Sequence, residues 1–437
     1  MKKNFYKIAL GTATVSLLIA ATLQSASMAG AGTPGGSRGP LNEPTFQGAG
    51  PWQVNSNAAT VARVCPAVAN AASCNALVLG EDQVAGHSPF GNSGRGLVST
   101  NDTFADNVNA LSPAQIISAY NFPTTSPSGG LPGTGKTIAI VDAYNDPNIA
   151  SDLATFDTQF SIPQLNSCTI TATSGPCFQK INWSGGTTYP AFDQGWALEI
   201  SLDVEWVHAI APGASILLVE ATSNSVPDLV RAITYASMKA QYVSMSFGAA
   251  ELSAETSTYD RAFTSTTASY FAAAGDAGLS TEWPSTSPKV ISVGGTTLSL
   301  TSTGTVASET GWINGGGGCS TYETATTSEA NYPTYAQANC AGKRATPDVA
   351  ADADPNTGVF VYNSNNFYGT TGWYTVGGTS LSTPIWAARS ADSGVVVNSA
   401  YIYGTNAINF YDVTQGGNAA GCLVGYDMCS GLGSRNN

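Results

Sequence analysis

The stretch Gly377-Gly378-Thr379-Ser380 places a serine after a glycine-rich turn, where a helix could begin and present the hydroxyl as a nucleophile. A serine hydroxyl is a weak nucleophile until a neighbouring group takes its proton, and that group is usually histidine. The chain has only two histidines, His87 and His208. Either this stretch is an ordinary polar loop, or a residue other than histidine activates Ser380.

Two carboxylates could supply the missing base. Glu199 and Asp203 lie four residues apart in the segment 194–210, whose apolar residues surround a predicted helix on nearly all sides. Close carboxylates in a partly buried place cannot both ionise easily, so one pKa rises and the pair titrates as a coupled unit. Glu199 could accept the proton of Ser380 with Asp203 behind it, and would do so in acid, where a histidine base is protonated. The alternative is a solvated acidic edge that also carries Glu205.

The elements that must position these residues alternate between apolar strands and helices. Continuous apolar strands separated by helices are typical of a parallel sheet covered on both faces, in which sites gather at the carboxyl ends of the strands. The expected strands are 137–144, 215–221, 242–248, 269–276 and 290–295, and the expected helices are 149–158, 194–210, 226–240 and 254–266. Ser112-Pro113-Ala114-Gln115 has the form of a capping box and predicts where this domain begins.

Several short motifs follow one another along the chain, and as a set they are more informative than any one of them alone. They are Glu199-x-x-x-Asp203, "APGA" at 211–214, "SMSFG" at 244–248, "AAAGDAG" at 272–278, "ISVGGT" at 291–296, "TPDVAADADPNTG" at 346–358, "GGTSLSTP" at 377–384 and "DVTQGGN" at 412–418. Over residues 111–437 the chain resembles the sedolisin family of serine-carboxyl peptidases.

That resemblance implies a subtilisin-like, three-layer α/β fold with a mainly parallel central sheet and helices on both faces. It implies a catalytic triad of Ser380, Glu199 and Asp203. It also implies that Asp276 and the backbone N–H of Ser380 face the oxyanion of the reaction. Asp142, at the end of a predicted strand, either supports the carboxylates or is structural. His208 is expected to be a packed core residue.

The resemblance also implies one structural Ca²⁺ near the C-terminus. The residues indicated are Asp412 and Asp427 through their carboxylates, and Val413, Leu423 and Gly425 through their carbonyl oxygens. Such an all-oxygen set suits a hard cation. The alternative is that these are two loop aspartates in a glycine-rich tail. The expected partners are polypeptide substrates, and the protein is expected to be a monomer.

The N-terminal region predicts export. Residues 1–29 have a basic start, an apolar run and a small-residue end, as in a secretory signal peptide, and no second apolar run reaches the roughly 18 residues of a membrane span. Residues 30–110 read as a glycine- and proline-rich linker and a short extension. The extension is shorter than the large folded prodomain that the resemblance implies. We expect a secreted protein, extracellular or periplasmic, with no membrane segment in its mature form.

Eight cysteines fall into four close pairs, which in an oxidising compartment predicts four local disulfides. Metal binding is the other possibility, although no C-x-x-C spacing occurs. The pairs are Cys65 with Cys74, Cys168 with Cys177, Cys319 with Cys340 and Cys422 with Cys429.

Charge is scarce, since 10% of residues are charged and the formal net charge is -13. A surface with few ion pairs loses little when carboxylates become protonated, so the composition suits acidic surroundings, although it also suits any secreted protein with a neutral polar surface. The acidic balance argues against a nucleic-acid partner, which would need clustered Lys and Arg. The function expected is that of an acid-active endopeptidase forming an acyl-enzyme on Ser380. The alternative is a weak or silent relative that binds peptides or surface polymers.

Overall fold

The computed structural model describes residues 52–54, 60–80, 110–127, 129–171, 175–404 and 410–434. All of these belong to one compact unit, Phe46–Asn437. The expected signal peptide, most of the expected linker and His87 lie outside the described residues.

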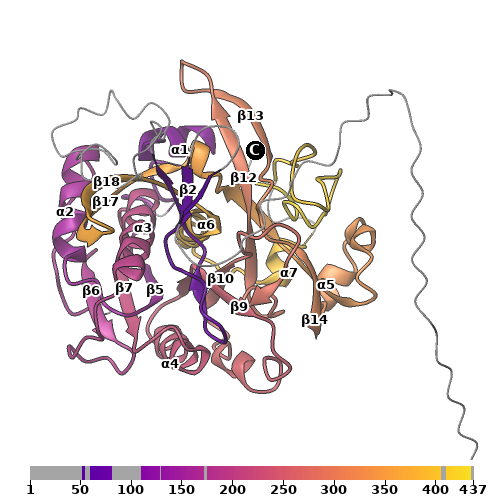
Figure 1. Cartoon of the computed structure of the whole chain (residues 1–437), viewed down its shortest axis with the longest axis horizontal. Coiled ribbons are helices and arrows are strands. Elements are labelled where there is room, and N and C mark those ends of the chain that lie inside the picture. Colours follow the sequence, from indigo (N-terminus) through magenta and orange to yellow (C-terminus); the bar gives the residue numbers. More distant parts are fainter. Residues whose placement is uncertain are drawn as a thin grey trace, which may run out of the picture. The chain divides into compact units, whose positions relative to one another are not determined.

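A mainly parallel sheet of eight strands forms the centre of this unit (Figure 1). All neighbouring strands pair in parallel except the antiparallel pair β12–β13. Every residue of β7, β8 and β10 is buried, which explains why these strands are continuously apolar in the sequence. The strand order is β13 (Val306–Gly311), β12 (Ile291–Leu300), β10 (Ser269–Ala273), β8 (Tyr242–Met245), β5 (Thr137–Ala143), β7 (Ser215–Ala221) and β6 (Phe178–Asn182), with β16 (Val349–Asp352) also paired to β12.

Helices cover this sheet, and the expected α/β architecture is confirmed. Helix α3 (Gln194–Ile210) is buried from Gly195 to Ile210, and Asp193 caps it by accepting the N–H groups of Gly195 and Trp196. Helix α6 packs against α3 and against the central strands. The longer helices are α2 (Ile149–Phe160), α3, α4 (Val226–Ser237) and α6 (Thr379–Ser393), and the shorter ones are α1 (Pro113–Ala119), α5 (Thr327–Ala330) and α7 (Ser399–Ile402).

A second sheet brings the N-terminal extension onto the domain. Strands β2 and β4 of the extension pair with each other, and β4 pairs with β18, which leads into Ser380. The order is β1 (Trp52–Val54), β2 (Thr60–Arg63), β4 (Leu77–Gly80), β18 (Thr370–Gly377) and β17 (Val359–Phe367). Two smaller sheets are β11 (Glu282–Trp283), β9 (Phe247–Ala250) and β3 (Ser73–Cys74), and the pair β14 (Gly318–Thr324) and β15 (Lys343–Thr346).

One expected helix is wrong. The segment 254–266 contains turns and a short 3-10 helix, Tyr259–Ala262. The buried Asp260 accepts hydrogen bonds from Trp283 Nε1 at 3.1 Å and Ser287 Oγ at 2.6 Å, and these contacts hold the segment as a loop. The capping box at Ser112 and Gln115 is confirmed, and α1 begins at Pro113.

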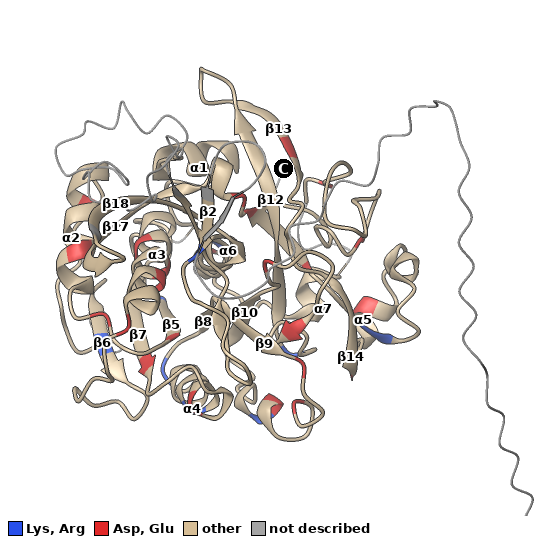
Figure 2. Cartoon of the chain, viewed as in Figure 1, with Lys and Arg blue, Asp and Glu red and all other residues tan. Residues whose placement is uncertain are grey.

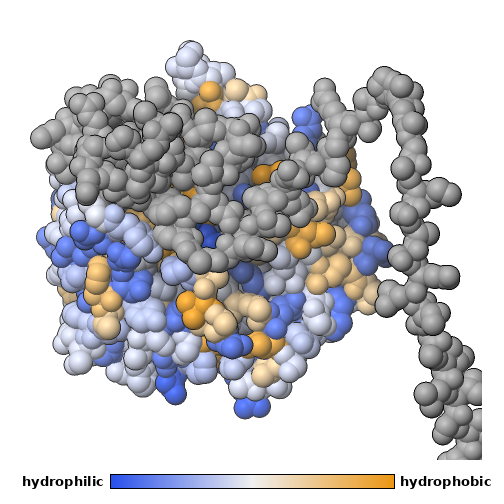
Figure 3. Space-filling view, viewed as in Figure 1, coloured by the Kyte–Doolittle hydropathy of each residue, from blue (hydrophilic) through white to orange (hydrophobic). Residues whose placement is uncertain are grey.

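The surface and the cross-links agree with the composition. Lysine and arginine are few and scattered (Figure 2), and most of the described surface that is visible in Figure 3 ranges from hydrophilic to neutral, with small apolar areas. The four expected cysteine pairs are all joined as disulfides. Among the described helices, none combines the length and the apolar character needed to cross a membrane.

Candidate active site

Ser380 lies in the first turn of α6, directly behind the turn formed by Gly377 and Gly378. Gly378 has a φ of 98°, and a Cβ at this position would lie 2.6 Å from Asp276 Oδ2, so only glycine fits without a shift. Ser380 is buried, and its hydroxyl donates a hydrogen bond to the carbonyl oxygen of Ser246 at 2.9 Å. The nucleophile of the sequence prediction is therefore held at the carboxyl end of β8.

Three carboxyl groups gather beside this serine. Glu199 and Asp203 come from α3 and Asp142 comes from β5, and one oxygen of each lies within 4.8 Å of the others. All three residues are 0% exposed. Burial raises the pKa of Asp142 to about 8. Burial, and then the neighbouring carboxyls, raise the pKa values of Glu199 and Asp203 well above the ordinary range, while Ser380 acts in the opposite direction on Glu199.

These pKa directions mean that the cluster keeps its protons to a higher pH than isolated carboxyls do. Among the described residues, Asp142 has no hydrogen-bond donor, and the only donor close to Glu199 is the Ser380 hydroxyl, which is directed at the Ser246 carbonyl. Three buried carboxyls with so few donors can coexist only if some carry protons and bond to one another. The alternative prediction, in which Glu199 and Asp203 form an acidic edge exposed to solvent, is thus excluded. It is also excluded for Glu205, which is buried and accepts the N–H of Tyr362 at 3.0 Å.

Ser246, at the end of the expected strand 242–248, connects the cluster to Ser380. Its hydroxyl donates to Asp203 Oδ1 at 2.8 Å and lies 3.3 Å from the carbonyl oxygen of Ser380. That carbonyl lacks its usual helical donor because Pro384, four residues further along α6, has no N–H. The proline of the "STP" motif therefore leaves this carbonyl without a backbone donor from the next helical turn, close to the Ser246 hydroxyl.

Asp276 faces the same region from the carboxyl end of β10. Its Oδ1 accepts hydrogen bonds from the N–H and the hydroxyl of Thr379, at 2.8 and 2.9 Å. Its Oδ2 is buried without a partner among the described residues. Burial raises the pKa of Asp276 to about 7, while the Thr379 N–H and the positive charge of Arg63 oppose this shift. In acid this carboxyl is protonated, and Oδ2 is free to donate a hydrogen bond.

The N-terminal extension also enters this site, which the sequence did not predict. The backbone N–H of Ser380 donates to the carbonyl oxygen of Asn75 at 2.8 Å. A Cβ atom added to Gly378 would lie too close to both this carbonyl oxygen and Asp276 Oδ2. The two oxygens therefore lie on the same side of the turn. The position expected for a reacting carbonyl is thus filled by a residue of the chain itself.

His208 takes no part in these contacts, and His87 lies outside the described residues. His208 is buried at the end of α3, where its Nε2 lies 2.9 Å from the carbonyl oxygen of Pro163 and 3.4 Å from Asp157 Oδ1. It packs in the core, as expected, while its Nδ1 has no hydrogen-bond partner among the described residues.

The expected calcium ligands lie together but present different atoms. Asp427 Oδ2 accepts the N–H of Leu423 at 2.7 Å, and Asp412 Oδ2 accepts the N–H of Gly425 at 2.8 Å. Asp427 Oδ1 accepts the N–H groups of Cys429 and Ser430, at 3.0 and 2.7 Å. Two residues expected to offer carbonyl oxygens therefore offer N–H groups to the carboxylates.

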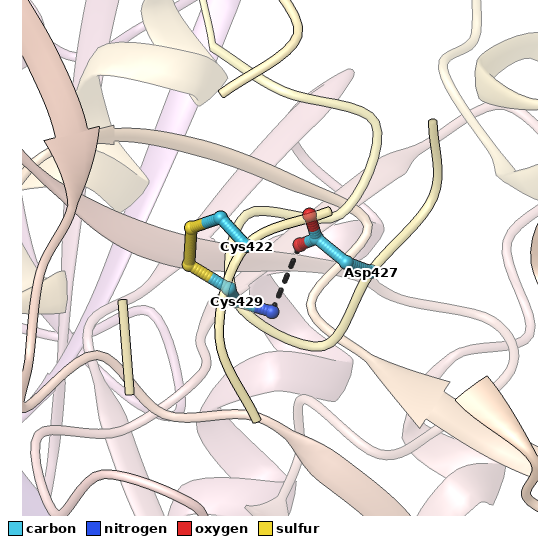
Figure 4. Close-up of side chains that lie close together, drawn as sticks. All are labelled: Cys422, Asp427 and Cys429. Atoms are coloured by element: carbon cyan, nitrogen blue, oxygen red, sulfur yellow. Dashed lines mark hydrogen bonds between the residues drawn. A yellow bond between two sulfur atoms is a disulfide. The ribbon is translucent and has the colours of Figure 1, made fainter. Parts of the chain in front are cut away.

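The set therefore fits a cation only in part. Asp412 Oδ1 is buried and has no partner among the described residues, so it is the oxygen best placed to take a cation. Cys422 and Cys429 lie close to Asp427 but are joined as a disulfide, so neither offers a thiolate to a metal (Figure 4).

Comparisons with known proteins agree with this geometry. Residues 192–394 match the model of the subtilase family. The chain is 31% identical to kumamolisin from Bacillus sp. (strain MN-32) over 369 residues, which cover 74% of this chain and 62% of kumamolisin. It is 35% identical over 180 residues to sedolisin from Pseudomonas sp. (strain 101). These similarities support membership of the sedolisin family.

A solved sedolisin structure supports the fold. Pseudomonas sedolisin, described as a serine-carboxyl proteinase complexed with two molecules of pseudo-iodotyrostatin, matches with a TM-score of 0.61 and 26% identity, covering 75% of this chain and 95% of that one. The present sedolisin-family chain spans less than two thirds of the relatives' own lengths, with 62% of kumamolisin and 29% of sedolisin covered. The subtilisin-like architecture expected from the sequence is confirmed.

Proposed function

We propose that this protein is a secreted, acid-active serine-carboxyl endopeptidase that cleaves polypeptides through an acyl-enzyme on Ser380. The observation that carries the proposal is the placement of Ser380 beside the buried carboxyls of Glu199, Asp203 and Asp142, with Asp276 facing the same turn. Family membership supports the same chemistry.

Glu199 is the general base. For attack, the Ser380 hydroxyl exchanges its bond to the Ser246 carbonyl for one to Glu199, and its proton passes to that carboxylate as the oxygen adds to the peptide carbonyl. Glu199 then gives this proton to the leaving amine, and a water molecule repeats the sequence on the ester. The base is the state in which the cluster has lost one proton, so its apparent pKa belongs to three carboxyls together.

Asp276 is the acid that stabilises the oxyanion. With Oδ1 held by Thr379, the proton resides on Oδ2, and it joins the Ser380 N–H in donating to the developing negative charge. Because the pKa of Asp276 is raised to about 7, this donor persists through acid and disappears near neutrality. Ionisation of Asp276 then sets the upper limit of activity near neutral pH, and the first loss of a proton from the carboxyl cluster sets the lower limit.

Export and calcium complete the proposal. Four disulfides favour an oxidising compartment, which agrees with the signal peptide expected at residues 1–29. A single Ca²⁺ would be held by the carboxylates of Asp412 and Asp427 and by the carbonyl oxygens of Val413, Leu423 and Gly425. Binding would replace the hydrogen bonds that the N–H groups of Leu423 and Gly425 now donate to these carboxylates. When bound, the ion supplies structural stability and takes no part in the reaction.

Hydrolysis of a quenched-fluorescence peptide library from pH 2 to 8 tests the function. Turnover confined to acid, lost in Ser380→Ala, is the expected result. Peptide binding without turnover at any pH would contradict it, and would favour the silent relative that binds peptides.

A further inference from the structure

Ser246 contacts both Ser380 and the carboxyl cluster of Asp142, Glu199 and Asp203, through two different atoms. Its carbonyl oxygen accepts the Ser380 hydroxyl at 2.9 Å, and its own hydroxyl donates to Asp203 Oδ1 at 2.8 Å. The residue is 0% exposed and directly follows β8. One buried serine therefore fixes the nucleophile and the carboxyl group of Asp203 relative to each other.

The bond from Ser246 makes the two oxygens of Asp203 different. Oδ1 accepts the Ser246 hydrogen, whereas Oδ2 is buried and has no hydrogen-bond partner among the described residues. A protonated carboxyl group has one O–H and one carbonyl oxygen, and the carbonyl oxygen is the better acceptor. The Ser246 hydroxyl therefore favours Oδ1 as the carbonyl oxygen and Oδ2 as the oxygen that carries the proton.

The titratable groups around Asp203 are the partners for that proton. Glu199 lies one turn earlier on α3 and Asp142 lies on β5, and one carboxyl oxygen of each of the three residues lies within 4.8 Å of the others. Asp276 acts on Glu199 from the carboxyl end of β10. All of these groups are acidic, so a proton on Asp203 Oδ2 is shared with another carboxyl oxygen.

Helix α6 keeps the Ser246 hydroxyl in this position. The Ser246 Oγ lies 3.3 Å from the Ser380 carbonyl oxygen, which has no donor from the next helical turn because Pro384 lacks an N–H. The hydroxyl has one hydrogen to donate, and Asp203 Oδ1 is the nearer of its two acceptors. A residue without this hydroxyl would leave neither oxygen of Asp203 with a donor among the described residues.

We propose that Ser246 is a positioning residue of the reaction, which keeps the proton of Asp203 on Oδ2 and so available to the carboxyl cluster. This inference rests on the proposed function. The role is comparable to that of the aspartate in a Ser-His-Asp triad, which fixes the proton on the correct atom of the base. Without the hydroxyl the proton can occupy either oxygen, so fewer molecules have Asp203 set to stabilise Glu199 as it accepts the proton of Ser380.

Ser246→Ala tests the role, because it removes the hydroxyl and keeps the carbonyl that accepts the Ser380 hydroxyl. The value of kcat should fall about tenfold to a hundredfold, the effect of one hydrogen bond to a charged group, with KM little changed. Loss of a donor to a carboxylate disfavours its ionised form, so the acid limb of the pH–rate profile should move up by about one pH unit. The alkaline limb, set by Asp276, should stay in place, whereas a general loss of structure would not move one limb alone.

Ser244→Ala is the matched control. Ser244 lies on β8, is 0% exposed, and has a hydroxyl with no hydrogen-bond partner among the described residues. This substitution should leave kcat and both limbs unchanged. Ser246→Thr retains a hydroxyl and should keep the acid limb of the wild type. Identical profiles for Ser246→Ala and Ser244→Ala, or an equal shift in Ser246→Thr, would overturn the inference.

Infrared spectroscopy without catalysis separates this inference from the proposed function. The protein is the Ser380→Ala full chain in acid, and the signal is the C=O stretching band of protonated Asp203, identified by its loss in Asp203→Asn. If Oδ1 is the carbonyl oxygen, adding Ser246→Ala removes its hydrogen bond and should move this band to higher frequency, whereas adding Ser244→Ala should not. If no variant hydrolyses any peptide, the proposed function fails, while the moved band upholds the placement of the proton. An unmoved band overturns that placement.

Discussion

Asp276 and Thr379 are joined by two hydrogen bonds to one carboxylate oxygen, from the Thr379 N–H and hydroxyl at 2.8 and 2.9 Å. Thr379 directly precedes the nucleophile, so this contact fixes the carboxyl relative to Ser380. It also decides which oxygen is left to carry a proton.

The first prediction follows from this orientation. In Asp276→Asn, the amide oxygen can accept from Thr379 while the amide N–H₂ takes the place of Oδ2 and its proton. The variant then keeps a donor at every pH, so the alkaline limb of the pH–rate profile, set near 7 by Asp276, should move upward even if the peak rate falls. Rates of peptide hydrolysis from pH 3 to 9 test this. An unchanged alkaline limb would assign that limb to another group.

The second prediction concerns the base. Glu199→Gln should lower the rate by about four orders of magnitude, comparable to Ser380→Ala, because both remove a member of one catalytic unit. The matched control is Glu205→Gln on the same buried helix, whose carboxyl contacts the Tyr362 N–H instead of the cluster. The rates of peptide hydrolysis are measured in discontinuous assays, and circular dichroism checks that each variant is folded. Substantial activity in Glu199→Gln would rule out the carboxylate base.

The third prediction is that the fold is more stable in acid than at neutral pH. Burial raises the pKa of Asp142 and of Glu220 to about 8 and that of Asp276 to about 7, against values near 4 in an unfolded chain. Between about pH 4 and 8 the native state therefore binds more protons than the unfolded state, and stability falls as pH rises through this window.

Urea unfolding of Ser380→Ala at pH 4 and pH 8 measures this effect without autolysis. Asp142→Asn should flatten the dependence, since one pKa unit corresponds to about 1.4 kcal/mol. The surface residue Asp228, paired with Arg231 at 2.8 Å, provides the control substitution Asp228→Asn. Equal stability at the two pH values would mean that the buried carboxyls are ionised in the native state.

The fourth prediction concerns calcium. A metal that binds only the folded state adds about 2.7 kcal/mol at a hundredfold excess over its Kd, so chelation should lower the melting temperature. Asp412→Ala should abolish the difference between chelated and calcium-loaded protein, whereas Asp228→Ala should preserve it. A melting temperature that changes with neither calcium nor chelator would exclude the calcium site.

The main elements of the fold could be read from the sequence because local and tertiary signals agree there. Helix α3 was placed at 194–210 from its apolar residues, and the capping residue Asp193 and complete burial give the same bounds. The segment 254–266 failed because its conformation is set by contacts of Asp260 with Trp283 and Ser287, which a local pattern does not contain.

The site was predictable where motifs named its residues and not where strand pairing brought them in. Ser380, Glu199, Asp203 and Asp276 were expected together, and the structure brings them to one place. The entry of Asn75 was missed because β3 has two residues and no periodicity to read. Only its pairing with residues 247 and 248, more than 170 positions away, places it in the cleft.

The separation of the site residues along the chain bears on when the proposed activity arises during folding. Asp142 lies on β5, Ser246 follows β8, Asp276 follows β10, and Ser380 follows β18, so no two of these residues come from adjacent segments of the chain. Contacts of such sequence separation form late, after the strands between them have docked. A chain that is only partly synthesised or partly folded therefore lacks the assembled active site. The proposed proteolytic activity should therefore arise in one step, at the end of folding.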